Sequence, residues 1–418
     1  ERRGFAMIRD IWRQAWEAMI YNRRRTFITV IGMAWGIATV VLLLAYGAGF
    51  GRAIQNIFAE WGTYLIGVFP GRTSQQVGGS KAGVQVRLTQ DDVERLWATV
   101  PGVTHISPAM FKQVNVASDE HMYSWELNGY RAEIANVLKL DIEQGHFFTD
   151  QDDQDRAHVA VLGSEAKTKL FNGRYAIGQR IRLNGIGFTV IGVLEPKMQE
   201  GEDDVNRQVY IPFNTFSDFG DTKYLGGIWL TYHGDNQVVE QDVRNTLAAM
   251  HNFLPSDHNA IFVANLMHQL RQFQIITIAL EALLLFIGAL TLGIAGIGLM
   301  NIMLVAVQQR TKEIGIEKAL GARKRHILFQ FLSEALVIAG AGGVLGILLA
   351  YIVSFSVGSI TFYSAIAKHA HDADIHLLIS PLSVILATGI LGVVGLVSGM
   401  IPALRAANLD PIEALRYE

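Results

Sequence analysis

The sequence predicts an α-helical membrane protein with four transmembrane helices and an α+β extracytoplasmic domain. Four long segments contain no charged residue, and a helix that crosses a bilayer core requires about 20 apolar residues. Half of the 418 residues are hydrophobic and only 17% are charged, whereas soluble domains carry about 25% charged residues. Lysine and arginine are concentrated beside some of these segments and scarce beside others, which indicates one orientation in the membrane.

The composition excludes several classes of function. The formal net charge is −3, so no overall basic field favours nucleic acid as a partner. The chain has no cysteine, which excludes disulfides, thiolate metal sites and cysteine nucleophiles. The phosphate loop GxxxxGK(S/T), the zinc motif HExxH and a serine nucleophile elbow do not occur. We therefore expect no catalytic residue, cofactor site or metal site on this chain, and no enzyme activity of its own.

The charge-free segments, with His376 counted as neutral, are residues 26–51, 282–309, 335–367 and 375–404. Basic residues lie at Arg23, Arg24 and Arg25 and throughout the loop 308–327, whereas Lys368 is the only one between the third and fourth segments. Because basic loops stay in the cytoplasm, both termini and the loop 308–327 are predicted to be cytoplasmic.

Before the first span, Ile8, Trp12 and Trp16 recur at helical spacing, which favours an amphipathic helix in the membrane interface over one packed on another domain. The predicted order is an interfacial helix in 1–25, transmembrane helix 26–51, extracytoplasmic domain 52–271, transmembrane helix 272–307 with an outer extension, cytoplasmic loop 308–327, transmembrane helix 328–358, outer loop 359–379, transmembrane helix 380–404 and cytoplasmic tail 405–418.

The segment 52–271 has the patterning of a soluble α+β domain. A capping-box-like start at Thr89–Asp92 predicts a helix, and Asn184-Gly185 predicts a hairpin turn. Strands are predicted at 159–162, 180–183, 188–193 and 209–213, and helices at 243–253 and from Asn265 into the second span.

Two acidic or histidine-rich segments were weighed as metal sites. Asp150, Asp152, Asp153 and Asp155 resemble a calcium loop but lack its glycine and its final glutamate, so a solvated turn is favoured. His369, His371 and His376 could suit zinc or nickel, or titrate near neutral pH, or belong to a plain hydrated loop. Because alternation at a spacing of two without a rigid scaffold is a weak metal signal, the hydrated loop is favoured.

The loop 308–327 carries the most informative motif, QRTKEIGIEKALGA at 309–322. Glu313 and Glu317 lie one helical turn apart, beside a small apolar face, and Gly321 is placed to end the helix. Such a helix, joined to membrane helices at both ends, is suited to dock into a groove of a partner. A simple connector is the alternative on the pattern alone.

This motif, with Asn301–Leu304 before it, resembles the permease motif of the MacB and FtsX families of ABC transporters. The tail PALRAANLDPIEALR at 402–416 resembles their C-terminal motif. The segments at 145–148, 159–163, 177–178, 188–193 and 211–212 resemble the MacB-type periplasmic core. One departure is Glu317, where the family usually has a basic residue.

The resemblance implies a non-catalytic permease subunit of the cell inner membrane, with its large domain in the periplasm. That domain would have a porter-like lobe, 52–130 with 222–271, and an inserted β-rich lobe, 131–221. Two permease subunits would pair, as a homodimer or heterodimer, and bind two ABC ATPase subunits that carry ATP and Mg²⁺. Because only 25 residues precede the predicted span 26–51, the ATPase is expected on a separate chain. The expected coupling residues are Lys312, Glu313, Ile314, Gly315, Ile316, Glu317, Lys318, Ala319, Leu320, Gly321 and Ala322.

The favoured function is MacB-type efflux by mechanotransmission, with an adaptor and an outer-membrane channel as candidate partners. Glu281 and Glu334 form no charged path across the spans. Lipoprotein release in the manner of LolC and LolE, with a hook in 71–86, and FtsX-like control of cell-wall hydrolases remain alternatives. Close helix packing is expected at the GxxxG pairs Gly32/Gly36, Gly342/Gly346 and Gly395/Gly399.

Overall fold

The computed structural model describes residues 23–60, 62, 64–75, 82–198, 205–365 and 373–416. The chain divides into two units. The helical unit is drawn from Glu1–Arg52, Ile276–Ile360 and Ile375–Glu418, and the α/β unit from Ala53–Ile275 and Thr361–Asp374. The predicted interfacial helix lies outside the described residues for all but its last three positions, and His369 and His371 also lie outside them.

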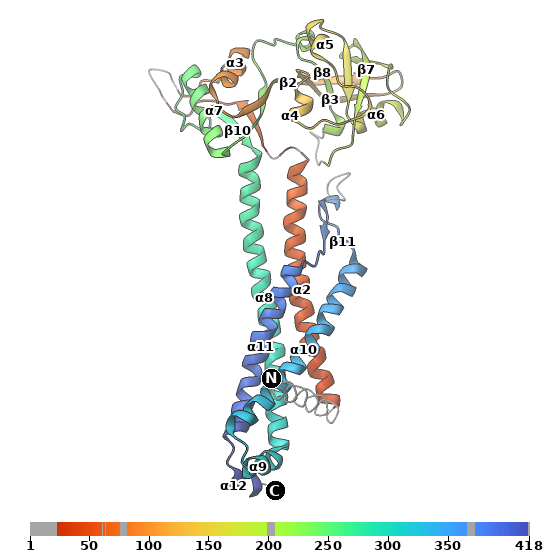
Figure 1. Ribbon diagram of the computed structural model, residues 1–418. Coiled ribbons are helices and arrows are strands. Elements are labelled where there is room, and N and C mark those ends of the chain that lie inside the picture. Colours follow the sequence, from red (N-terminus) through yellow and green to blue (C-terminus); the bar gives the residue numbers. More distant parts are fainter. Residues whose placement is uncertain are drawn as a thin grey trace, which may run out of the picture. The chain divides into compact units, whose positions relative to one another are not determined.

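Four helices in the described residues are long and apolar enough to cross a membrane, as the sequence predicts (Figure 1). They are α2 (Arg23–Ala59), α8 (Leu266–Gln309), α10 (Lys324–Val357) and α11 (Pro381–Asn408). Ser380 caps α11, since its Oγ accepts a hydrogen bond from the Ser383 N–H at 3.1 Å, and Pro381 fits the first turn. Both α2 and α8 extend beyond the predicted spans 26–51 and 272–307.

The helical unit also contains two short helices, α9 (Thr311–Ala319) and α12 (Pro411–Arg416), and the paired strands β11 (Ser359–Ile360) and β12 (Ile375–His376). Figure 1 shows α9 and α12 side by side at one end of this unit, and their backbones are in contact. His376 lies in β12, paired with Ser359. No group of three or more metal-ligating side chains occurs within the part of the chain that the structure describes.

The α/β unit is built on one mixed sheet. Its strands are β1 (Leu65–Pro70), β2 (Val103–Ala117), β3 (Met122–Tyr130), β4 (Ile142–Gly145), β5 (Val159–Leu162), β6 (Arg180–Leu183), β7 (Ile186–Leu194), β8 (Val209–Pro212), β9 (Gly227–Tyr232) and β10 (Ile261–Asn265). The order is β10-β1-β9-β2-β3-β8-β5-β7-β4, with β6 pairing with β2 and β7. The predicted hairpin turn is present, with Asn184 and Gly185 both at positive φ.

The sheet runs without a break through both the porter-like and the β-rich parts. The long strand β2 explains this continuity, because its first half pairs with β9 and its second half with β3 and β6. The helices are α3 (Gln90–Thr99), α4 (Ile134–Val137), α5 (Asp150–Gln154), α6 (Ser164–Phe171) and α7 (Asn236–His251), with 3₁₀ turns η1 (Val205–Arg207), η2 (Asn214–Asp218) and η3 (Tyr363–Ala365).

The core of the α/β unit follows the alternation of its strands. Ile66 and Val68 of β1 are fully buried in one apolar cluster with Leu96 of α3 and Val243 of α7. The capping box of α3 forms as predicted, with Asp92 Oδ2 accepting the Thr89 N–H at 2.7 Å. Helix α7 begins before the predicted 243–253, because Asp235 accepts the Gln237 N–H and caps the helix there.

The solvated-turn prediction for the aspartates from Asp150 onward is confirmed for the exposure of Asp150 and Asp155 but is wrong for the backbone and for Asp153. Residues 150–154 form α5, because Thr149 accepts the Asp152 N–H at the start of the helix. Asp153 is buried, and its Oδ1 accepts the Asn214 N–H at 2.7 Å. Asp153 therefore joins α5 to η2. In the segment 71–86, Arg72 pairs with Gln85, and the tip 76–81 lies outside the described residues.

Candidate functional site

The informative motif of the sequence forms α9, between the second and third candidate spans. The helix ends at Ala319 because Gly321 adopts a φ of +99° and donates its N–H to Lys318 O at 3.0 Å. At its other end, the Thr311 hydroxyl donates to Gln308 O at 2.8 Å, which continues the last turn of α8. The sequence therefore encodes the C-terminal limit of this helix, while its start follows directly from the end of α8 without a side-chain cap.

The predicted coupling residues divide between two faces of α9. The inward face contains Ile314, 2% exposed, and Gly315, also buried. The outward face contains two large apolar side chains, Ile316 at 51% exposed and Leu320 at 84% exposed. Exposed charged or small residues surround these two, namely Lys312, Glu313, Glu317, Ala319 and Gly321, while Lys318 and Ala322 are half-buried. Gly315 therefore packs inside the unit and is not placed to admit a partner.

We name the exposed set Lys312, Glu313, Ile316, Glu317 and Leu320 the α9 surface. Exposed apolar side chains in a charged surround are typical of a protein interaction site. Such a surface at the end of membrane helices can receive a partner protein.

An ion pair holds the start of α9 to α10. Arg310 Nη1 lies 3.2 Å from Glu334 Oε2, and the Glu334 side chain is 11% exposed. Glu334 is therefore part of a helix-to-helix contact.

Helix α12 was not singled out from the sequence as part of this site. Asp410 starts it by accepting the Ile412 N–H at 2.8 Å, and Ala414 is buried. Ile412 is 78% exposed and lies on a helix that contacts α9. The Asp410-Pro411 pair is a helix-start signal that could have revealed α12.

The predicted packing glycines lie in different surroundings. A Cβ at Gly342 would lie 2.6 Å from Met33 Cβ of α2, and a Cβ at Gly346 would overlap Ala34 O and the Ile37 side chain. On α11, Gly399 faces Ala335 of α10. Of the rest, Gly395 faces Ala339, Gly36 faces Leu292, and Gly32 has no neighbour within 4 Å in the described chain.

The fold and this site can be compared with known proteins. The family model of the MacB-like periplasmic core domain matches residues 26–246, and that of the FtsX-like permease C-terminal matches residues 285–411. The chain belongs to the MacB family of ABC transporter permeases.

The sequences of known relatives align with almost the whole chain. The macrolide export ATP-binding/permease protein MacB of Bdellovibrio bacteriovorus is 32% identical, over 97% of this chain and 61% of that protein. The pyoverdine export ATP-binding/permease protein PvdT of Pseudomonas entomophila is 31% identical, over 97% of this chain and 59% of that protein. The chain thus spans about three fifths of the length of these relatives.

Among solved structures, the periplasmic region of MacB from Actinobacillus actinomycetemcomitans aligns with a TM-score of 0.43 and 19% identity. The alignment covers 53% of this chain and 97% of that one.

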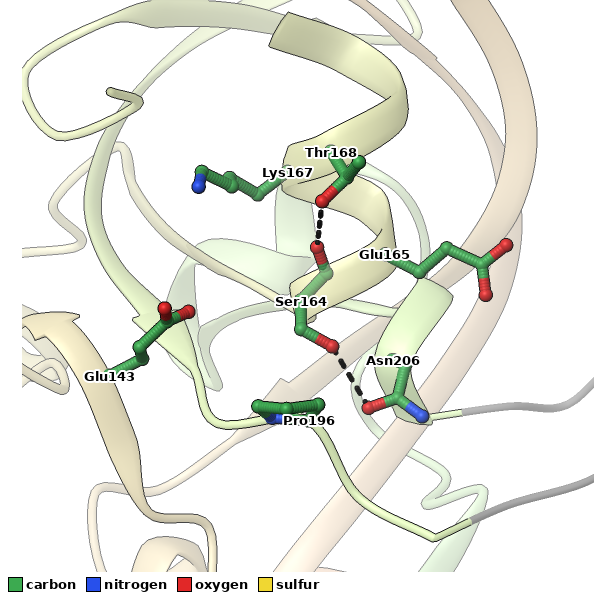
Figure 2. Close-up of a pocket in the computed structure, with 7 residues that line it drawn as sticks. All are labelled: Glu143, Ser164, Glu165, Lys167, Thr168, Pro196 and Asn206. Carbon is green, nitrogen blue, oxygen red and sulfur yellow. Dashed lines mark hydrogen bonds between the residues drawn. The ribbon is translucent and has the colours of Figure 1, made fainter. Parts of the chain in front are cut away.

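The α/β unit of this MacB-family chain contains a cavity of about 390 Å³ (Figure 2). Its lining residues are Glu143, Ser164, Glu165, Lys167, Thr168, Pro196 and Asn206. The Ser164 hydroxyl donates to Asn206 Oδ1 at 3.0 Å, and the Thr168 hydroxyl donates to Ser164 O at 3.0 Å. Glu165 binds Lys169 at 3.0 Å and Arg207 at 3.2 Å. These polar groups hold the wall together, so the cavity gives no argument for a ligand.

Proposed function

We propose that this chain is the permease part of a MacB-type ABC exporter and that an ATP-binding domain docks on the α9 surface. The relatives bear names that combine ATP binding, a permease and export, which supports pairing with an ATP-binding domain. ATP and Mg²⁺ would bind to that domain, since the printed sequence contains no phosphate loop. Its location on a separate chain stays a prediction.

The observation that carries the proposal is the exposure of Ile316 and Leu320 on a helix joined to two candidate spans. Large apolar side chains that protrude from a short helix bury most of their surface when they enter a groove. Glu313 and Glu317 flank them and would face basic groups of the partner. The unusual Glu317 then favours a partner whose groove is matched to this chain.

In the proposed cycle, ATP binding closes two ATP-binding domains and displaces α9. Because the Thr311 hydroxyl and the backbone join α9 to the end of α8, displacement of α9 would move α8 along its axis. The substrate would be expelled by motion of the α/β unit on the far side of the inner membrane. A second permease copy would complete the assembly, and an adaptor and an outer-membrane channel are proposed as further partners.

The decisive variant is Leu320→Asp, which places a charge on the most exposed apolar position of the α9 surface. Interface hot spots cost about 2 kcal/mol or more when they are removed, so we expect association with the ATP-binding domain to fall about thirtyfold or more. Co-purification and transport in proteoliposomes measure this. Ile316→Pro should have the same result, because proline interrupts a helix interior at a cost of about 3 kcal/mol.

Val238→Asp is the matched control. Val238 is 58% exposed on α7 of the α/β unit, so the same substitution changes another exposed helical position. We expect that variant to assemble normally. Full assembly and full transport in both the Leu320→Asp and Ile316→Pro variants would show that α9 is only a connector.

A further inference from the structure

Lys318 joins the C-terminal end of α9 to the C-terminal end of α11. Its Nζ donates to Ala407 O at 2.8 Å and also to Leu409 O. Ala407 lies in the last turn of α11, and Leu409 is the residue that follows the helix. These atoms belong to segments separated by almost 90 positions in sequence, so only the fold brings them together.

The physical chemistry of a helix end makes this contact effective. The last four carbonyl groups of a helix lack partners within the helix and carry partial negative charge. A lysine ammonium supplies three donors and a positive charge, so it satisfies two such carbonyls at once. Burial, and then the neighbouring Lys324, lowers the pKa of Lys318.

Lys318 completes a set of three connections that hold α9. Thr311 connects it to α8, Arg310 connects it to α10 through Glu334, and Lys318 connects it to α11. The first two lie at the start of α9 and the third lies at its end. With both ends held, α9 cannot pivot without moving all three long helices.

We infer that Lys318 is a positioning residue that fastens the coupling helix to the fourth span, so that displacement of α9 is delivered to α11 as well as to α8. The contact also keeps α12, which follows α11 within two residues, beside α9. The inference rests on the proposed function, because that function supplies the displacement of α9.

The test uses the full chain with its ATP-binding domain in nanodiscs. The chain contains no cysteine, so spin labels can be placed at Ala319→Cys on α9, outside the α9 surface, and at Arg405→Cys on α11, both exposed positions. We expect a narrow distance distribution that ATP does not change. In Lys318→Met we expect a broadened distribution and about tenfold less transport per ATP hydrolysed, as expected for loss of hydrogen bonds from a charged group.

Two variants control for folding. Lys318→Arg keeps the charge and the donors, so we expect it to restore the narrow distribution. Lys324→Met is the matched control. Within the described part of the chain, the Lys324 amine donates one hydrogen bond, to the exposed Asn408 side chain at 3.2 Å. If Lys318→Met fails to fold, Lys318→Gln, whose amide is too short to reach both carbonyls, takes its place.

The outcomes separate the two proposals. The Ala319→Cys label alone, measured between two copies of the permease, reports whether α9 moves on ATP binding. No movement would overturn the proposed function. The role of Lys318 would be overturned by a different result. In that case α9 moves on ATP binding, but Lys318→Met has the same distance distribution and the same transport per ATP hydrolysed as the parent. A purely structural role would lower thermal stability without changing that ratio.

Discussion

In the α/β unit, helices pack on a sheet through branched and aromatic side chains, whereas in the helical unit α10 packs on α2 and α11 through glycine and alanine. Leu96, Val243 and Ile66 represent the first kind of packing. Gly342 against Met33, and Gly399 against Ala335, represent the second. The solvent explains the difference. In water, burial of large apolar surface drives association, but lipid is as apolar as leucine, so helices in a membrane gain mainly from close backbone approach.

The largest effect is expected where a glycine of the helical unit touches backbone. A Cβ at Gly346 would overlap Ala34 O and would lie 3.0 Å from Ala34 Cα. Backbone atoms cannot turn aside as a side chain can, so Gly346→Val should destabilise the contact by about 3 kcal/mol. The measurement is thermal unfolding of the purified chain in detergent.

Gly340→Val is the matched control on the same helix. Gly340 is exposed and has no neighbouring atom within 4 Å of its Cβ position in the described chain. We expect its melting temperature to equal that of the parent. Equal loss of stability in both variants would mean that helix propensity, rather than close approach, sets the cost.

A second comparison concerns two lysines that each bind carbonyls at a helix end. In the α/β unit, Lys197 Nζ donates to Leu138 O at 2.7 Å, next to α4, and to Glu60 O at 3.0 Å, next to α2. Lys197 is 7% exposed, and burial lowers its pKa to about 8. The Lys318 amine is less buried, and burial lowers its pKa as well.

This difference predicts a pH effect of intermediate size. Between pH 8 and the ordinary lysine pKa of 10.5, the unfolded chain holds a proton that folded Lys197 has lost. The free energy of unfolding therefore rises with pH through this window, by up to about 3 kcal/mol. From pH 8 to 10.5, the melting temperature of the parent should therefore rise relative to that of Lys197→Met. Parallel curves would show that Lys197 stays charged.

The smallest effect is expected at an exposed ion pair. Arg174 Nη2 lies 2.6 Å from Glu120 Oε2, with side chains 65% and 50% exposed, and it lowers the pKa of Glu120. The Arg310–Glu334 pair is longer, at 3.2 Å, but far more buried. Exposed pairs contribute little, whereas removing one partner of a buried pair leaves an uncompensated charge. Glu120→Gln should therefore leave the melting temperature unchanged, and Glu334→Gln should lower it clearly. A larger drop in melting temperature for Glu120→Gln than for Glu334→Gln would mean that the length of an ion pair matters more than its burial.

Much of the fold could be predicted because its signals are local. The charge-free runs predicted the four long helices, and the short strands around Asn184-Gly185 were found by alternation and turn chemistry. The strands β1, β2, β3, β4, β9 and β10 were not predicted, because their place in the sheet depends on pairing between residues far apart in the chain. The helix α5 was missed because four aspartates masked the cap provided by Thr149.

The sequence by itself determined the membrane class, the family motifs and the C-terminal end of α9, since uncharged length and turn residues act over a few positions. Tertiary structure alone decided which residues of that helix face outward. Both Gly315 and Leu320 belong to the motif 312–322. In the folded chain Gly315 is buried, whereas Leu320 is exposed. It also decided the role of Lys318, because the carbonyls that its amine binds belong to α11, and a helix end cannot be matched to a distant lysine until the chain has folded.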